Sequence, residues 1–197
     1  MWKRSSVLCA FVVLAALTSS CIFDPKKDDG PPPPPTGDYK DLTNRSDVLF
    51  NLQKSYNDRN MTEYERILDD NFTFFLSDGD VNGGLPVQWG RRDELDANTN
   101  LFSRTVPPGA TWPLCTSIQM DVQFEAGLQW VEVIPDAAPD ETWYTTTCFY
   151  DFQIEVEPDT KYIPYPGAKA QFTVRNAGTD SNPRWQLVEW RDLGGAQ

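Results

Sequence analysis

Histidine is absent from all 197 residues of this chain. Its absence removes the side chain that most often acts as a general base at neutral pH. It also removes the Ser–His and Cys–His nucleophile pairs and most zinc sites. Acid–base chemistry would therefore fall to Asp, Glu, Tyr or Lys, and the sequence predicts neither a cofactor nor a metal site.

Basic residues are scarce. The chain has 17 Lys and Arg against 29 Asp and Glu, and two of the basic residues lie before residue 21. The remainder therefore holds 15 basic and 29 acidic residues, a net charge of −14. Phosphate backbones and anionic lipid surfaces would repel such a chain, so we expect no nucleic-acid partner.

A long apolar run is also missing from the N-terminus. Val7–Leu17 follows Lys3 and Arg4 but is too short to span a bilayer, which predicts that residues 1–20 are a signal peptide. The next residues, "LTSSC", resemble the lipobox of bacterial lipoproteins and imply lipidation of Cys21. The alternative is an ordinary secretory signal that leaves Cys21 as a plain thiol. Ile22 is not the retention aspartate, which favours the outer membrane of the cell envelope, facing the periplasm or the cell surface.

Residues 21–40 contain few apolar side chains and five consecutive prolines, Pro31–Pro35. Proline fixes φ and removes the N–H donor, so this segment predicts a stiff polyproline II spacer behind a membrane anchor. A proline-rich signalling ligand is the alternative. Residues 41–197 are long enough for one domain.

Cysteine is limited to four residues. Cys9 leaves with the signal peptide, and Cys115 and Cys148 form an even pair in an oxidising compartment, which predicts a disulfide. Two buried free thiols are the alternative. The strand register stays open: a turn near 127–133 would place the two cysteines opposite one another, whereas a turn at 135–140 would separate them.

The stretch "DGDVNGG" (78–84) matches half of a calcium-loop pattern. The twelfth position of such a loop needs a bidentate Glu, and here it holds Trp89. The preceding "FTFFLS" is typical of a strand rather than a helix. The glycines and Asn82 therefore predict a turn between two strands.

Three helices are predicted before the period of the sequence changes. The first has Ser46 or Thr43 as N-cap and one apolar face, formed by Val48, Leu49, Leu52 and Tyr56. The second begins with a capping box from Thr62 to Glu65. The third begins at Gly90 and places Leu95 and Phe102 on one face.

From Cys115 onward, apolar residues alternate with polar ones in "SIQMDVQF", "CFYDFQIEV" and "AKAQFTVR". This alternation predicts antiparallel strands with one buried face. The run "RWQLVEWRD" is apolar on both faces and predicts a more covered strand.

The order of these elements resembles the nuclear-transport-factor-2-like superfamily over about residues 42–193. The resemblance rests on "SYNDRNMTEYERILDDNFTFFLSDG", "WGRRDEL" and the closing "QFTVR" and "RWQLVEWRD". It implies an α+β fold in which a curved antiparallel sheet wraps around the N-terminal helices as a cone.

The superfamily includes enzymes such as ketosteroid isomerase, but that resemblance places Leu52 and Leu76 at the two catalytic positions. Only Tyr56 and Glu189 remain as candidate catalytic groups. Six aromatic residues are expected to meet inside the cone: Phe74, Trp89, Phe102, Tyr150, Phe152 and Trp190. They would either line an open pocket or form a filled core. The same residues would suit a small apolar ligand or a homodimer contact through the sheet. We therefore predict a lipid-anchored, non-catalytic domain that binds a small apolar ligand or an envelope protein. The alternative is an isomerase-, cyclase- or dehydratase-like enzyme with an acid in the cone.

Overall fold

The computed structural model describes residues 38–110, 112–123, 129–136, 138–157, 160–162 and 167–194. The predicted signal peptide, the lipidated Cys21 and the proline-rich spacer lie outside the described residues. In the part that is described, no helix has both the length and the apolarity needed to cross a membrane.

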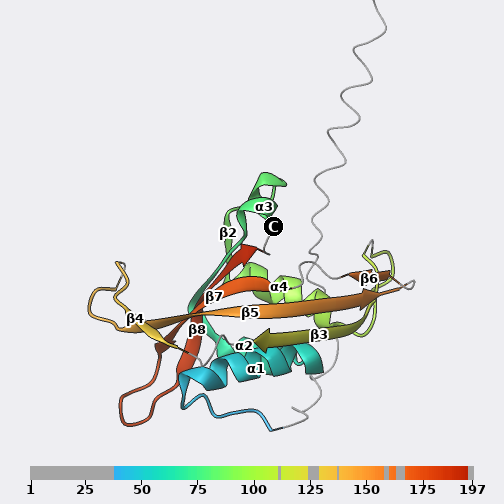
Figure 1. Cartoon of the computed structure of the whole chain (residues 1–197). Coiled ribbons are helices and arrows are strands. Elements are labelled where there is room, and N and C mark those ends of the chain that lie inside the picture. Colours follow the sequence, from blue (N-terminus) through green and yellow to red (C-terminus); the bar gives the residue numbers. More distant parts are fainter. Residues whose placement is uncertain are drawn as a thin grey trace, which may run out of the picture.

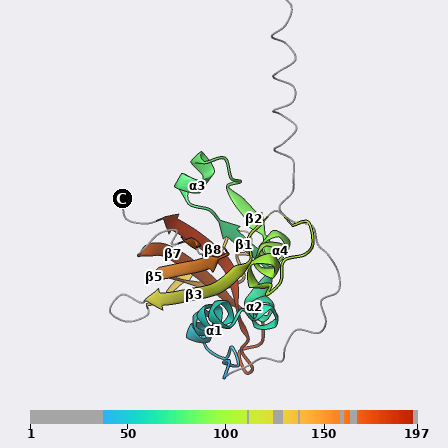
Figure 2. The same cartoon turned by 90° about the vertical axis from the view of Figure 1, so that its right-hand side faces the viewer.

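Four helices and eight strands make up the described domain (Figures 1 and 2). The helices are α1 (Arg45–Asp58), α2 (Met61–Ile67), α3 (Asp78–Asn82) and α4 (Arg91–Phe102). The strands are β1 (Leu68–Phe75), β2 (Gln88–Gly90), β3 (Cys115–Gln123), β4 (Val131–Val133), β5 (Trp143–Val156), β6 (Thr160–Tyr162), β7 (Ala168–Asn176) and β8 (Trp185–Gly194).

The strands form one curved sheet in the order β2-β1-β8-β7-β5-β3, and both β4 and β6 pair with β5. Helices α1, α2 and α4 lie together against one side of this sheet, and α3 projects beside its β2 end (Figure 2). The predicted α+β cone is therefore confirmed.

One pairing in the sheet differs from the antiparallel prediction. Strands β1 and β8 run parallel, with Phe74 opposite Trp190, so the sheet is mixed. Strand β8 lies between β1 and β7, as its apolar residues on both faces had indicated. Alternation of side chains reports which face is buried but carries no information on strand direction.

The first helix buries the predicted apolar face, including Leu49 and Leu52, which are at most 1% exposed. Its N-cap is neither Ser46 nor Thr43 but Asn44, whose backbone N–H donates to the Asp47 carboxylate at 2.9 Å. The second helix is capped by Asn60, which accepts from the Glu63 N–H at 3.2 Å, so the capping box predicted from Thr62 is wrong.

Helix α1 also covers the free edge of the sheet at β3. The Asn57 side chain accepts from the Met120 N–H at 2.7 Å and donates to the Met120 carbonyl at 3.0 Å. Gln53 accepts from the Val122 N–H at 3.0 Å. Asn57 and Gln53 thus pair backbone groups of β3 that could otherwise hydrogen-bond to a strand of another chain.

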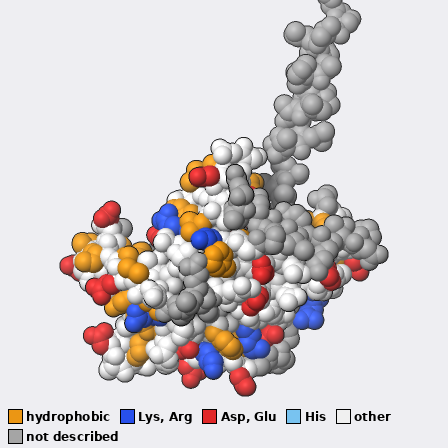
Figure 3. All heavy atoms as spheres, viewed as in Figure 1, with side chains coloured by type: hydrophobic (Ala, Val, Ile, Leu, Met, Phe, Trp, Pro, Cys, Tyr) orange, Lys and Arg blue, Asp and Glu red, His pale blue; other side chains and the backbone are white. Residues whose placement is uncertain are grey.

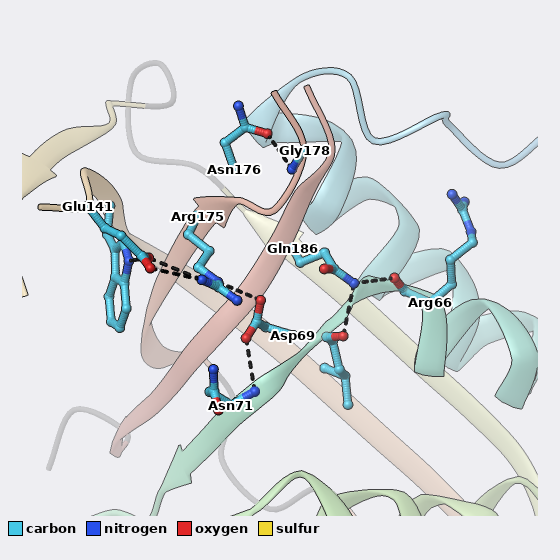
Figure 4. Close-up of polar contacts among 10 residues, drawn as sticks. Arg66, Asp69, Asn71, Glu141, Arg175, Asn176, Gly178 and Gln186 are labelled. Atoms are coloured by element: carbon cyan, nitrogen blue, oxygen red, sulfur yellow. Dashed lines mark hydrogen bonds and ion pairs between the residues drawn. The ribbon is translucent and has the colours of Figure 1, made fainter. Parts of the chain in front are cut away.

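A buried polar junction connects β1, β7 and β8 (Figure 4). The Asp69 carboxylate, 1% exposed, accepts from Arg175 Nε at 2.6 Å and from the Asn71 N–H at 2.9 Å. Arg175 also contacts Glu141 at 3.1 Å. Gln186 Nε2 donates to the backbone carbonyl of Leu68, the first residue of β1, at 3.1 Å. Each buried charge here has hydrogen-bonded partners, which is the condition for keeping it buried.

Candidate functional site

Helix α4 directs a polar side chain into the centre of the fold. Glu94, Asn98 and Phe102 lie four residues apart on the helix and are 2%, 4% and 5% exposed. The sequence had indicated Leu95 and Phe102 as the buried face, but Leu95 is only partly buried. The inner face of α4 is therefore polar for two of its turns.

The Glu94 carboxylate collects hydrogen bonds from three elements. Oε1 accepts from the Tyr64 hydroxyl of α2 and from Asn98 Nδ2 at 2.8 Å. Oε2 accepts from Trp89 Nε1 of β2 at 2.6 Å. Burial raises the pKa of Glu94 above its ordinary value, and these three donors oppose that effect. The carboxylate thereby holds α2, β2 and α4 together.

Two tyrosine hydroxyls extend this cluster towards α1. Tyr56 donates to the Tyr64 hydroxyl at 3.4 Å, and Tyr64 donates in turn to Glu94. Burial is the main cause that raises the pKa of both tyrosines well above 10, and the Glu94 charge raises it further. Both hydroxyls therefore stay protonated at physiological pH and act as donors.

A second carboxyl group lies towards the other end of the same interior. Asp192 is two residues beyond Trp190, on the same face of β8, and accepts from the Gly194 N–H at 2.8 Å. Burial raises the pKa of Asp192, with a smaller contribution from the charge of Asp80. The Tyr150 side chain hydrogen-bonds to Asp192 and opposes that rise. Tyr150 also lies near enough to influence Tyr56.

The six aromatic residues predicted to line the cone are brought together. Trp89 stacks on Phe74 with ring centroids 4.9 Å apart, and Phe74 contacts Trp190 at 5.2 Å. Trp190 then contacts Tyr150 at 6.1 Å and Tyr56 at 6.3 Å. The remaining two predicted residues, Phe102 and Phe152, contact Tyr56 at 5.1 and 5.3 Å. The rings form one connected cluster; that they line a pocket stays a prediction.

Trp190 has a further property within this cluster. Its side chain is 5% exposed, yet Nε1 has no hydrogen-bond partner in the part of the chain that the structure describes. A buried indole N–H normally finds an acceptor, because leaving it unpaired costs about 1–3 kcal/mol. Phe74 and Phe152 share the inner face with Trp190 and are only partly buried.

The two candidate catalytic residues lie in different places. Tyr56 is 5% exposed and lies inside the cone. Glu189 lies on the opposite face of β8 from Trp190 and pairs with Arg191 at 3.2 Å. Arg191 stacks over Phe75 on that outer face, 3.6 Å from the ring centroid. The suggestion that Glu189 reaches the cone is therefore wrong.

The predicted disulfide is contradicted. Cys115 faces Val156 and Cys148 faces Ala170, and both cysteines are free and buried. Val156 and Cys148 are eight residues apart on one strand, about 25 Å. This separation is far beyond the reach of a disulfide. The strand register agrees with a turn at 135–140, which separates the two cysteines, because β4 and β5 pair as a hairpin with Val133 opposite Trp143.

The segment 78–84 joins β1 to β2 as predicted: Asp78–Asn82 form a single helical turn, α3, and Gly83 and Gly84 form a turn after it. Ser77 is its N-cap and accepts from the Asp80 N–H at 3.3 Å, and Gly84 has a φ of 98°. Within the described ranges, no group of three or more acidic or cysteine side chains is arranged to hold a metal ion.

Hydrophobic side chains gather on the surface around β4, among acidic groups (Figure 3). Val131 and Ile134 there are 59% and 66% exposed. Exposed apolar groups of this kind are candidate protein contacts. The envelope-protein partner and the homodimer stay predictions.

Sequence reasoning missed Glu94, Asn98, Tyr64 and Asp192. Glu94 and Asn98 have the four-residue spacing of one helix face, but the pattern of apolar residues, which predicts the buried face, does not include them. No local pattern in the sequence indicates that the Tyr64 hydroxyl meets Glu94. The two-residue spacing of Trp190 and Asp192 in a predicted strand is the signal that places both side chains on one face.

No protein-family model matches this chain, and no curated protein matches it. Solved structures do match. A conserved protein from Planctomyces limnophilus superposes with a TM-score of 0.50 at 13% identity, covering 74% of this chain and 89% of its own. A candidate aromatic ring hydroxylase from Novosphingobium aromaticivorans gives 0.51 at 8% identity, covering 78% and 88%.

An NTF2-like protein of unknown function in nutrient uptake, from Rhodospirillum rubrum, gives a TM-score of 0.47 at 11% identity, covering 77% of this chain and 98% of its own. At such identities, structural likeness concerns the fold alone and leaves activity open. The described domain has the curved-sheet α+β fold that the sequence resemblance to the nuclear-transport-factor-2-like superfamily implied, and it shares its fold with the Planctomyces and Novosphingobium proteins.

Proposed function

We propose that this protein is a lipid-anchored domain of the bacterial envelope that binds a small, largely apolar molecule inside its cone and does not transform it. The observation that carries this proposal is the incomplete burial of two rings in the inner aromatic cluster. Phe74 and Phe152 point inward yet are only partly buried, while Trp190 and Tyr56, which they contact, are 5% exposed. Aromatic walls with a few polar groups are the usual lining of a small-molecule site.

The polar groups of the interior support binding rather than catalysis. Glu94 is engaged by three donors and is 2% exposed, so its lone pairs are largely occupied. Leu52, at a position where ketosteroid isomerase resemblance implies a catalytic tyrosine, is fully buried. A general base must come within about 3 Å of the proton it removes, and Glu94 is shielded from such an approach.

The experiment is to extract the full chain from its own membrane and record native mass spectra before and after denaturation. We expect a small molecule that is released only on denaturation. A chain that carries no additional mass, under conditions in which it stays folded, would count against ligand binding.

One observation favours an enzyme as the second candidate. Burial raises the pKa of Asp192 above its ordinary value, and Tyr150 lies beside it as a hydroxyl donor. If the chain turns over a bound molecule, Asp192→Asn should abolish turnover, whereas Glu189→Gln on the outer face should leave it intact. Turnover that survives Asp192→Asn would exclude this candidate.

A further inference from the structure

The indole N–H of Trp190 is a buried donor that the described residues leave without an acceptor. Its ring is held from several sides, by Phe172 at 5.1 Å, Phe74 at 5.2 Å and Tyr150 at 6.1 Å. The Trp190 side chain is 5% exposed, so these contacts keep it largely out of water. The unpaired donor therefore indicates that an acceptor is supplied from outside the described protein atoms.

The surroundings restrict the charge of that acceptor. The inner side of the fold carries the carboxyl groups of Glu94 and Asp192, and the buried residues of the described chain include no Lys or Arg. The nearest arginine on β8, Arg191, lies on the outer face with Glu189. An anion would therefore meet like charges with no cation to offset them.

The walls restrict its shape. Phe74 and Phe152 present partly exposed rings on the same inner face as Trp190. Ring faces favour flat partners, which they contact by offset stacking or edge-to-face packing. Asp192 and Tyr150 add a polar edge at this end of the interior.

We propose that the cone binds an uncharged aromatic molecule whose carbonyl or ether oxygen accepts the Trp190 indole N–H. This proposal rests on the proposed ligand-binding function and names the ligand class and the residue that selects it. The oxygen pairs the buried donor, and the ring of the ligand packs against Phe74 and Phe152.

The test uses the full chain labelled with ¹⁵N at its tryptophan indoles, which gives at most seven side-chain signals. The signal missing from Trp190→Phe identifies Trp190. Acetophenone is titrated as the probe, and α-methylstyrene is its matched control, because a methylene group replaces the carbonyl oxygen in an otherwise similar shape. Benzoate is the anionic control.

We expect acetophenone to move the Trp190 indole proton downfield and to saturate, with weaker binding by α-methylstyrene and by benzoate. Trp190→Phe should weaken acetophenone binding about threefold to tenfold and leave α-methylstyrene binding unchanged. The control Trp185→Phe, at a ring that contacts Tyr144 instead, should bind acetophenone like the wild type.

Two results would overturn the proposal. One is an upfield Trp190 indole proton that acetophenone does not move, because such a shift means that the N–H points into a neighbouring aromatic ring. The other is equal binding of acetophenone and α-methylstyrene by wild type and Trp190→Phe. If native mass spectra still show a bound molecule in either case, the ligand-binding function stands and only the assigned ligand class and donor fail.

Discussion

Trp89 Nε1 donates to Glu94 Oε2 at 2.6 Å across the junction between β2 and α4. The same carboxylate accepts from Tyr64 on α2, so one buried side chain joins a strand and two helices. Gly90, between them, is the N-cap of α4. The helix that reaches the inner aromatic cluster through Phe102 is thus positioned by a polar contact rather than by apolar packing alone.

Glu94→Ala should lower the free energy of unfolding by about 3 kcal/mol or more. The change leaves buried donors on Tyr64, Trp89 and Asn98 without their acceptor, and each unpaired group costs about 1–3 kcal/mol. Glu94→Gln keeps one acceptor and should cost less. Urea denaturation measures both; Asp96→Ala, on the exposed side of the same helix, is the control and should have little effect.

The stability contributed by Glu94 should depend on pH. Its pKa is higher in the folded chain than in the unfolded one, so the unfolded state releases the proton first as pH rises. The stability of the wild type relative to Glu94→Gln should therefore be greatest at about pH 4, below the unfolded pKa. It should fall as pH rises through the folded pKa. Parallel stability curves for the two proteins would refute this assignment.

Arg175→Met should destabilise the domain by about 3–5 kcal/mol, because it leaves the carboxylate of Asp69 buried without its cation (Figure 4). Arg92→Met is the matched control, since Arg92 is 88% exposed and its closest approach to Asp96 is 3.9 Å. Chemical denaturation of both variants gives the comparison. Equal, small losses would mean that water or another group satisfies Asp69.

Cys115 and Cys148 should both react with an alkylating reagent in the denatured protein without prior reduction. In the folded protein they should react slowly at pH 8, because burial raises the pKa of the Cys148 thiol to about 12 and also raises that of Cys115. Mass spectrometry counts the labelled thiols. Recovery of one peptide that contains both cysteines joined by a disulfide would contradict the register of β3 and β5.

Cys21→Ser should move the protein from the membrane fraction to the soluble fraction of cells that carry the lipoprotein-processing enzymes. The proposed anchor is the lipid on this thiol, and the acidic domain offers no attraction to anionic lipid. Cys115→Ser, a change at a thiol inside the domain, should leave fractionation unchanged. A Cys21→Ser chain that still sediments with membranes would rule out the anchor.

Periodicity alone predicted much of this fold. The face of α1 containing Leu49 and Leu52 is buried as expected, α4 begins after Gly90, and β7 buries Phe172 and Val174. These predictions succeed because burial of one face sets the spacing of apolar residues in helices and strands.

The polar features escaped sequence analysis for a physical reason. Glu94 is buried because donors from α2 and β2 converge on it, and that convergence exists only once the chain is folded. The parallel pairing of β1 with β8 also depends on long-range topology. The disulfide prediction failed because it was based on the oxidising compartment expected for the protein. The strand register separates Cys115 from Cys148.

The most direct test of ligand binding in the cone compares two phenylalanines. Phe152 belongs to the inner cluster and Phe50 is 46% exposed on α1. Each is changed to Asp in the full chain, and the small molecule released per folded chain is quantified by mass spectrometry. We predict that Phe50→Asp retains the amount found in the wild type and that Phe152→Asp loses it. Retention of the same molecule by a folded Phe152→Asp chain would contradict a binding site inside the cone.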